Sequence, residues 1–215
     1  MDTAGNKKVQ VYENLRRRII SVELSPGMPI NEADFAEELG VSKTPIREAL
    51  RQLERDGFVE NVPGRGSTIS YISSHEIKDV FQIREIIEIG AAKRIALQKG
   101  NQELSVLRDE CRKMLDDEKA TQELVSEWGG SWENVHFSIV KGLENQALTS
   151  MYSGLLDRMT RIRNYYGQKF TQRRFHDILT EHLELLDAIM DGDGKQAEEK
   201  MSQHLKTASA YIMGL

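Results

Sequence analysis

The sequence predicts a mainly α-helical protein of two parts: a winged helix-turn-helix domain over residues 1–72, and an all-helical bundle of six or seven helices over residues 73–215. Three observations lead to this fold class. Gly and Pro are sparse, at 16 and 4 of 215 residues. Hydrophobic residues recur at helical spacing along most of the chain. The one stretch with strand character, residues 58–72, follows three helical segments and closes the first part.

Composition is typical of a folded protein from a reducing compartment. The hydrophobic fraction is 39% and the charged fraction 29%, which is ordinary for a chain with a buried core. The single cysteine, Cys111, excludes an internal disulfide framework. The N-terminal stretch MDTAGNKKVQVYENLRRR lacks the apolar segment of a signal peptide, and no stretch is long enough to span a bilayer. We therefore expect a cytoplasmic protein with no membrane partner.

The first two helices are expected on either side of a break. The stretch VQVYENLRRRIISVEL spaces Val11, Leu15, Ile19 and Val22 along one helix face. SPGMPI then interrupts helical structure, because it holds two prolines and a glycine. A short second helix follows from Asn31, whose side chain is a good N-cap.

A third helix and a hairpin complete the first part. The helix is expected in TPIREALRQLERDG, with Ser42 or Thr44 as its N-cap, Pro45 in its first turn and Gly57 as its end. FVENVPGRGSTISYI has the composition of two short strands joined by a Pro-Gly-Arg-Gly turn. Helix, helix, turn, helix and hairpin is the order of elements in a winged helix-turn-helix.

The second part is a succession of helices. Ser73 and Glu76 form a capping-box pattern at the start of the first one. The connections between the helical stretches are short, as in helix bundles. We expect helices over residues 77–98, 102–118, 132–143, 146–167, 173–192 and 194–213.

A stripe of four cations follows the third helix at four-residue spacing. Its members are Lys43, Arg47, Arg51 and Arg55. Each step of four residues turns by about 40° around a helix, so the stripe occupies a sector of about 120°. An apolar sector lies about 110° away by the same geometry. That sector holds Ile46, Leu50 and Leu53. One face can therefore pack while the other stays exposed, and a projecting helix start fits the major groove of DNA.

Net charge does not decide whether this stripe binds nucleic acid. The formal net charge of the chain is −5, and residues 1–74 hold 10 Lys and Arg against 11 Asp and Glu. Cations at this spacing beside Glu48 and Glu54 occur on many solvated helix faces. The order of the elements favours DNA, because phosphate contacts depend on local charge. A winged helix that binds protein instead of DNA stays open.

These residues carry a resemblance to a known family. The stretch LSPGMPINEADFAEELGVSKTPIREALRQLERDGFVENVPGRGSTIS resembles the winged-helix domain of the GntR family of bacterial transcription regulators. The second part resembles the FCD-type effector domain of the FadR-like subgroup, through QIREIIEIGAA, VHFSIVKGLEN and EHLELLDAIMDGDGKQAEEKMSQHL. The resemblance implies a homodimer that binds a short palindromic operator in double-stranded DNA. It also implies that a small organic acid, bound in the helical domain, controls this binding, and repression is favoured over activation.

The resemblance further implies which residues contact DNA at the start of the third helix. The two base-reading positions of the family correspond to Lys43 and Arg47, and Lys43 stands where Arg is more common. Because Lys lacks the planar fork of Arg, its base contact is expected to be looser. Ser42 and Thr44 correspond to phosphate contacts through hydroxyls or backbone amides.

Further contacts are expected from the wing and from the rest of the stripe. The wing glycine of the family corresponds to Gly66, beside Arg65, which can enter a minor groove. Arg51 and Arg55 are expected to contact phosphates or to be solvated. An Arg that some members use before the turn corresponds to Ala33, so that contact is absent here.

Three of the five histidines, His136, His182 and His204, lie on different predicted helices of the second part. If those helices converge, the three can form a metal site with open positions, although a lone helical histidine is more often packed or exposed. The resemblance strengthens the metal hypothesis, because metal-binding FCD domains use histidines at these three positions and an Asp four residues before the first. Here that Asp position holds Trp132, which offers a metal no ligand atom.

Two hypotheses follow for this pocket. In the favoured one, the three histidines hold Zn²⁺ or a similar divalent cation, and a carboxylate or water completes the site. In the other, metal binding is lost or weak and Trp132 fills space above an organic ligand. Arg84 is expected to bind a carboxylate of the effector, although an ion pair with Glu88, one turn later, explains it equally well. His75 and His176 have no such role.

The leading function is thus a ligand-responsive, DNA-binding regulator that is not an enzyme. The alternative from another class is a metal-dependent hydrolytic enzyme that activates water at the three histidines. Against it, no carboxylate is clearly placed as a general base, and no catalytic triad or phosphate-loop motif occurs.

Overall fold

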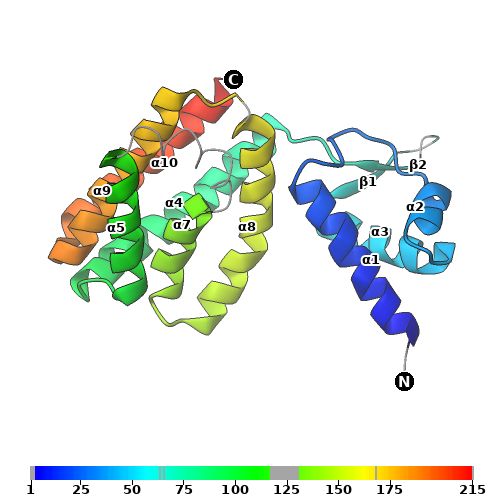
Figure 1. Cartoon of the computed structure of the whole chain (residues 1–215), viewed down its shortest axis with the longest axis horizontal. Coiled ribbons are helices and arrows are strands. Elements are labelled where there is room, and N and C mark those ends of the chain that lie inside the picture. The colour runs from blue at the N-terminus through cyan, green and yellow to red at the C-terminus, as the bar shows by residue number, and fades with distance from the viewer. Residues whose placement is uncertain (1–2, 63, 65, 117–130, 168, 215) are drawn as a thin grey trace. The chain divides into compact units, whose positions relative to one another are not determined.

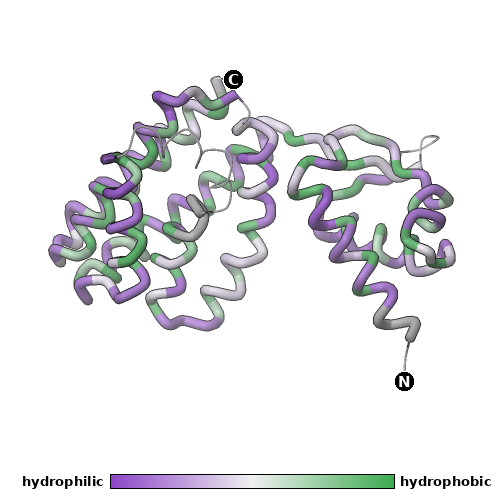
Figure 2. The backbone as a smooth tube through the Cα atoms, in the orientation of Figure 1, coloured by the Kyte–Doolittle hydropathy of each residue, from purple (hydrophilic) through white to green (hydrophobic). Residues whose placement is uncertain are grey.

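The computed structural model describes residues 3–62, 64, 66–116, 131–167 and 169–214. The chain divides into two compact units, Met1–Ser73 and Ser74–Leu215 (Figure 1). Hydrophilic and hydrophobic residues alternate along the helices of both units (Figure 2), as expected for helices that bury one face. The mainly helical fold class predicted from the sequence is confirmed.

The N-terminal unit packs three helices and a hairpin around one core. The helices are α1 (Thr3–Ile20), α2 (Glu32–Glu38) and α3 (Lys43–Arg55). α3 packs against both α1 and α2. The buried core consists of Val11, Leu15, Ile19, Leu24, Phe35, Ala36, Ile46, Ala49, Leu50, Leu53, Phe58, Val59 and Ile69.

The C-terminal end of α1 differs from the prediction. The spacing of apolar residues places Val22 on the helix face, and this is wrong: α1 ends at Ile20, and Val22 is half-buried with a left-handed φ of 63°. The reversed backbone lets the Leu24 N–H donate to the Arg18 carbonyl at 3.0 Å. Leu24 therefore takes the place in the core that the spacing assigned to Val22.

The starts of α2 and α3 are fixed in different ways. Oδ1 of Asn31 accepts a hydrogen bond from the Ala33 N–H at 3.0 Å, which is N-cap geometry. Ser42 precedes α3 in an extended conformation, but its side chain makes no capping bond. The exposed Ser42 hydroxyl therefore does not cap the helix. Gly57, with a φ of 82°, follows the end of α3.

The hairpin forms the wing of the N-terminal unit. Strands β1 (Val59–Val62) and β2 (Gly66–Ile69) pair antiparallel, with Val59 opposite Ile69 and Val62 opposite Gly66. Gly66 has a φ of 76°, which a side chain would strain. Pro63 and Arg65, in the turn, lie outside the described residues.

The C-terminal unit is a bundle with α4 at its centre. Its helices in the described part of the chain are α4 (Ser74–Leu97), α5 (Gln102–Asp116), α7 (Ser131–Lys141), α8 (Gln146–Gly167), α9 (Gln172–Asp191) and α10 (Gly194–Met213). α4 packs against α7, α8, α9 and α10, while α5 packs against α9 and α7. No helix among the described residues is long and apolar enough to cross a membrane.

A tight turn joins the last two helices. Gly192 ends α9 with a φ of 82°, and the Asp193 side chain accepts a hydrogen bond from the Gln196 N–H at the start of α10. The turn sets α10 against both α9 and α4. This arrangement allows residues on α9 and α10 to face the same interior space as residues on α4.

Candidate functional site

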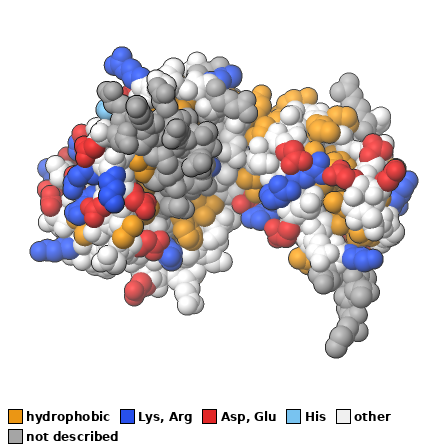
Figure 3. Space-filling view, viewed as in Figure 1, with side chains coloured by type: hydrophobic (Ala, Val, Ile, Leu, Met, Phe, Trp, Pro, Cys, Tyr) orange, Lys and Arg blue, Asp and Glu red, His pale blue; other side chains and the backbone are white. Residues whose placement is uncertain are grey.

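α3 presents two different faces. Its buried side consists of Ile46, Ala49, Leu50 and Leu53. Ser42, Lys43 and Thr44, at its start, are all exposed, and so are Arg47 and Arg51 further along. Lys and Arg side chains are interspersed with Asp and Glu on the face seen in Figure 3, so the protein does not carry one broad basic surface there.

Arg47, in the exposed stripe of α3, forms an ion pair with a carboxylate of α2. Its Nε donates to Oε2 of Glu32, on α2, at 2.7 Å, and the Arg47 side chain is 60% exposed. Arg55, at the other end of the stripe, donates to the Gln52 side chain. Gly66 is exposed on the wing, and its predicted neighbour in DNA contact, Arg65, lies outside the described residues. The structure therefore brings Arg47 and the exposed start of α3 to one surface.

The C-terminal unit brings together the three histidines on different helices. His136 comes from α7, His182 from α9 and His204 from α10, and all three are buried. Their ring centroids lie 4.6 to 5.1 Å apart, and one ring nitrogen of each lies within 4.8 Å of the other two. Nε2 of His136 lies 3.2 Å from Nε2 of His182.

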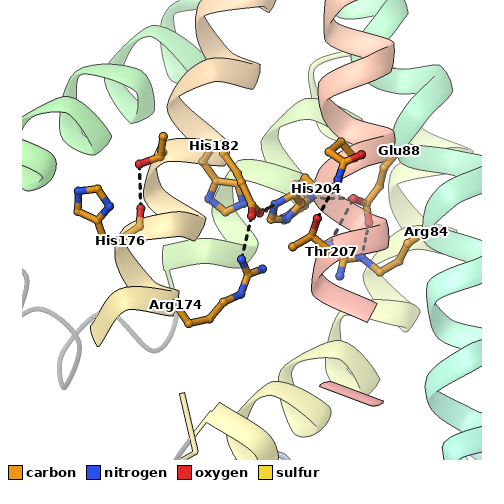
Figure 4. A network of polar contacts seen from close by, with 11 residues as sticks. Arg84, Glu88, Arg174, His176, His182, His204 and Thr207 are labelled. Carbon is orange, nitrogen blue, oxygen red and sulfur yellow. Dashed lines mark hydrogen bonds and ion pairs between the residues drawn. The ribbon is translucent and has the colours of Figure 1, made fainter. Parts of the chain in front are cut away.

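Two carboxylates hold the outer nitrogens of two of these rings (Figure 4). Oε2 of Glu88 lies 2.7 Å from Nδ1 of His136, and Oε2 of Glu181 lies 2.6 Å from Nδ1 of His204. Because an ionised carboxylate only accepts hydrogen bonds, each Nδ1 must donate. A neutral ring then has its lone pair at Nε2, the arrangement that metal-binding histidines adopt.

Arginines keep both carboxylates ionised. Burial opposes the charge on Glu88, yet Arg84 and His136 hold the pKa of Glu88 well below its usual range. Arg84 Nε donates to Oε1 of Glu88 at 2.7 Å. The hydroxyl of Tyr152 donates to the same oxygen at 2.6 Å. Glu88 is thus held by three different side chains in a site without solvent access.

Glu181 has a matching arrangement on the other side of the cluster. Arg174 donates to Oε1 of Glu181 at 2.8 Å, across two turns of α9 (Figure 4). Although burial opposes it, hydrogen bonds from His204 and Arg174 lower the pKa of Glu181. The cluster therefore contains two Arg–Glu pairs, each of which orients one histidine.

Two of the histidines are uncharged near neutral pH. Burial lowers the pKa of His136 to about 4 and holds the pKa of His182 well below its usual value. Neutral imidazole is the form that binds metal ions. Two metal–nitrogen bonds of about 2.1 Å separate their nitrogens by about 3.0 Å at a right angle and about 3.4 Å in a tetrahedron. The 3.2 Å between His136 and His182 fits this range.

The histidines lie on the wall of a cavity of about 420 Å³. Polar groups on this wall are the three histidines, Arg84, Arg163, Asn164, Arg174 and the hydroxyl of Tyr211. Its apolar lining consists of Val80, Phe81, Met159, Ile162, Phe170, Phe175, Ile178, Ala208, Tyr211 and Ile212. A cavity of this size accommodates a small organic molecule beside the histidines.

The structure thus brings four of the sequence-predicted pocket residues to one cavity: His136, His182, His204 and Arg84. Arg84 also makes the ion pair with Glu88 that the sequence offered as its alternative. Trp132 is in the first turn of α7, but its side chain lies outside the described residues.

Sequence reasoning missed Glu181, Arg174 and Tyr152. The seven-residue spacing of Arg174 and Glu181 on one helix face was the available indication for that pair. Tyr152 has no such indication, because its partner Glu88 lies on another helix. His176 is exposed, and its ring points away from the cluster (Figure 4).

Comparison with known families assigns both units. The FCD domain matches residues 79–207, and the domain of bacterial regulatory proteins of the gntR family matches residues 7–69. The chain belongs to the GntR family of regulators that carry an FCD domain. It is therefore a transcriptional regulator and not an enzyme, and the hydrolase alternative has no support.

Individual relatives agree with this assignment. The transcriptional repressor RspR of Escherichia coli is 26% identical over 94% of this regulator and 87% of its own length. A GntR transcriptional regulator of Rhodococcus sp. RHA1 shares the fold with a TM-score of 0.79 at 20% identity, over 97% of this chain and 98% of that one. The Zn²⁺-bound FCD domain of TM0439 matches with a TM-score of 0.56 at 23% identity, over 67% of this chain and 96% of that one.

Proposed function

We propose that this regulator represses transcription from a palindromic operator, and that a small organic acid controls its operator affinity from a metal-assisted pocket in the C-terminal unit. The observation that carries the proposal is the convergence of His136, His182 and His204 at one cavity. The same chain exposes the cationic start of α3, so one molecule holds a surface for DNA and an interior site for a ligand.

The exposed face of α3 supports the assignment of DNA contacts. Arg47 and Lys43 lie where a recognition helix reads base edges, and Arg can hold guanine O6 and N7 with two hydrogen bonds. Ser42 and Thr44 are exposed at the helix start, where backbone amides and hydroxyls bind phosphate. Arg51, one turn beyond Arg47, is assigned to a phosphate.

The wing and the assembly complete the DNA interface. Gly66 keeps the wing backbone in a left-handed conformation beside Arg65, which we assign to the minor groove. A palindromic operator has two half-sites, and a homodimer presents one α3 helix to each of them. The spacing of the two α3 helices then determines whether both half-sites are bound together.

The histidine cluster supports a divalent cation, for which Zn²⁺ is the best candidate. His136, His182 and His204 would be its ligands, and Glu88 and Glu181 would hold two of the rings in the binding tautomer. A cation bound by three neutral histidines is a Lewis acid with open positions that favour an anionic oxygen. Zn²⁺ binds an FCD domain in TM0439, which agrees with this choice.

The effector is assigned to the cavity beside the histidines. Arg84 lines it and would orient a carboxylate of the ligand, while its own charge is balanced by Glu88. Trp132, one turn before His136 on α7, is assigned to the effector by that spacing. Because α4, α9 and α10 all line the cavity, a ligand that favours one packing of these helices shifts the population of the DNA-binding form.

The test of DNA binding uses an operator selected from a random duplex library by the wild-type chain. In a fluorescence anisotropy titration, Arg47→Ala should lose operator affinity by about 5- to 150-fold per half-site, the contribution of a bidentate base contact. Its dimer and melting temperature should be unchanged, because the side chain is 60% exposed. Unchanged operator affinity in Arg47→Ala would remove this residue from the interface.

The test of effector control over operator binding uses the same operator and Zn²⁺-loaded protein. Small carboxylates are added one at a time at saturating concentration. At least one should change operator affinity, and the change should disappear in His182→Ala. His176→Ala, an exposed histidine on the same helix, is the matched control. If no carboxylate changes operator affinity, the effector part of the proposal fails while the DNA part stands.

A further inference from the structure

The cavity beside the histidines has a polar end and an apolar length. On α9, the lining runs from His182 to Ile178 and Phe175, and on α10 it runs from His204 to Ala208 and Ile212. With about 1.5 Å of rise per residue, the apolar part extends about 12 Å from the histidine layer along α10. One end can therefore hold a charged group while the remainder surrounds the body of a ligand.

The charges at the polar end are balanced within the protein. Arg84 is paired with Glu88, and Arg174 is paired with Glu181. Both guanidinium groups also lie over aromatic rings, Arg84 at 5.1 Å from the centroid of Phe81 and Arg174 at 5.4 Å from that of Tyr211. At the histidine end of the cavity, the charge that attracts an anion therefore comes from the proposed cation and suits one carboxylate, while Arg163 is a further cation on the wall beyond that end.

The apolar length offers few partners for hydroxyl groups. Among its described lining residues, polar side chains beyond the histidine end are the Tyr211 hydroxyl and the adjoining Arg163 and Asn164, where Arg163 contacts the Asn164 amide oxygen at 3.5 Å. Each hydroxyl of a ligand that is buried without a partner loses about 1–3 kcal/mol, the cost of desolvation. A polyhydroxy acid or a tricarboxylate is therefore a poor occupant.

We infer that the effector is a monocarboxylate with a hydrocarbon body, an arylalkanoic or medium-chain aliphatic acid. This inference rests on the proposed effector site and names the class of molecule that fills it. A dry cavity of about 150 Å³ holds benzene, and the cavity here, of about 420 Å³, has room for an aromatic ring with a short chain or for an extended chain. The carboxylate lies at the histidines, and the body packs against Ile178, Ala208 and Ile212.

Isothermal titration of Zn²⁺-loaded protein with two sets of acids tests this. Acetate, butanoate, hexanoate and octanoate, together with 3-phenylpropionate, form the apolar set, and D-gluconate and citrate form the polar set. Affinity should rise by about fourfold per CH₂ through the series, because each buried CH₂ contributes about 0.8 kcal/mol. Octanoate and 3-phenylpropionate should bind at least tenfold more tightly than either polar acid.

A variant of one lining residue localises the body of the ligand. Ala208→Leu fills the apolar length and should weaken octanoate binding by tenfold or more, while acetate binding and Zn²⁺ uptake stay unchanged. Ala210→Leu, at an exposed position of the same helix, should change none of these. If gluconate or citrate binds best, the inference is overturned while the proposed effector site stands. If no acid of either set binds, the effector site itself is overturned.

A different observation concerns Glu32 and the recognition helix. The carboxylate of Glu32 accepts from Nε of Arg47 at 2.7 Å, and Glu32 itself is partly buried. Bonding through Nε fixes the guanidinium plane and occupies neither terminal nitrogen. Among the described residues, no polar contact is seen for Nη1 or Nη2 of Arg47. Those two donors form the fork that matches the O6 and N7 edge of guanine.

We infer that Glu32 is a positioning residue that holds the Arg47 fork toward the DNA. This inference rests on the proposed base contact of Arg47. A flexible Arg loses side-chain entropy when it binds, and a guanidinium fixed in advance loses less. Glu32 also carries negative charge near phosphates, so it opposes DNA binding in general. Positioning of Arg47 strengthens operator binding, whereas the negative charge of Glu32 weakens binding to any duplex. The two effects can therefore be separated.

The affinities of Glu32→Ala for the selected operator and for a scrambled duplex separate the positioning effect of Glu32 from its charge effect. The ratio of the two affinities should fall by about five- to tenfold, part of what a bidentate base contact contributes. Affinity for the scrambled duplex should be unchanged or higher. Glu32→Gln keeps an oxygen acceptor and should restore most of the ratio. Asp34→Ala removes an exposed acid from the same helix without touching Arg47.

Two results would overturn the positioning role or its basis. Equal affinity ratios in Glu32→Ala and Asp34→Ala would reduce Glu32 to a general charge, and the inference would fail. A normal affinity ratio in Arg47→Ala would instead remove the base contact on which the inference rests, and both would fail.

Discussion

The cations of α3 and those of the histidine cluster lie in opposite environments. Lys43, Arg47 and Arg51 are exposed on a helix whose other side fills the core. Arg84 and Arg174 are buried, and each is bound to a carboxylate that in turn holds a histidine. The exposed cations of α3 can contact a partner at little cost in stability. Removing either residue of a buried Arg–Glu pair would instead leave an uncompensated charge in the interior.

Stability depends much more on the buried cations than on the exposed ones. A surface ion pair contributes about 0–1 kcal/mol, so evolution can change α3 without unfolding the N-terminal unit. The buried cluster is part of the packing of α4, α9 and α10, and it is also the proposed ligand site. In the proposed function, a ligand bound there would therefore act on helix packing, through which it would control operator binding.

The largest effect that separates the two environments is expected for Glu88→Ala. Removing this carboxylate leaves the buried Arg84 guanidinium without its ion-pair partner, which should lower the free energy of unfolding by about 3–5 kcal/mol. Glu198→Ala breaks the exposed pair with Lys93 and is the control, with an expected change below about 1 kcal/mol. Urea denaturation followed by circular dichroism measures both, and equal losses would contradict the distinction.

The two units should also respond differently to acid. The N-terminal unit contains no histidine, whereas burial lowers the pKa of His136 to about 4. Because this value lies below the ordinary pKa of about 6.5, protonation favours the unfolded state. The contribution of neutral His136 to the stability of the C-terminal unit is fully present above about pH 6.5. On the order of 3 kcal/mol of it should be lost as the pH falls from about 6.5 to about 4.

Hydrogen exchange of the full chain with a chelator present measures this response. Amides of α7 and α9 should lose protection over that pH range, after correction for the intrinsic exchange rate, while amides of α1 and α3 keep theirs. Equal changes in both units would show that the histidines do not govern the response.

The smallest expected effect is that of Arg51→Ala. It tests whether the stripe on α3 contains both base-reading and phosphate-contacting residues. Because Arg51 is assigned to a phosphate, Arg51→Ala should weaken operator and scrambled duplex alike. The slope of log affinity against log salt should fall in magnitude by about 1. An anisotropy titration over a range of salt concentrations checks this, and a loss of affinity for the operator alone would make Arg51 a base reader.

The fold could be predicted from the sequence because its determinants are local. The Asn31 cap, the end of α3 before Gly57 and the spacing of apolar residues mark where helices begin and end. Where a non-glycine residue adopts a left-handed conformation, as at Val22, spacing alone gives the wrong core residue. The exposed side of α3 followed from the same periodicity.

The pocket could be predicted only in part, because it is assembled from the five helices α4, α7, α8, α9 and α10. Their places on different predicted helices singled out the three histidines, and the family resemblance strengthened the metal hypothesis. Their convergence and the partners Glu181 and Tyr152 depend on tertiary packing. The ion pair of Arg84 and Glu88 lies within one helix and could be foreseen. A partner contributed by another helix leaves no mark in the local sequence, and this is the physical limit of the sequence analysis.

Calorimetric titration of chelator-treated protein with Zn²⁺ tests whether the buried cluster binds a divalent cation. Wild type and His176→Ala should each take up one Zn²⁺ per chain, and His182→Ala should bind at least 100-fold more weakly. Bound Zn²⁺ at 100 times its dissociation constant should also raise the free energy of unfolding by about 2.7 kcal/mol. Absence of uptake by the wild type, or uptake that His182→Ala leaves unchanged, would contradict the account.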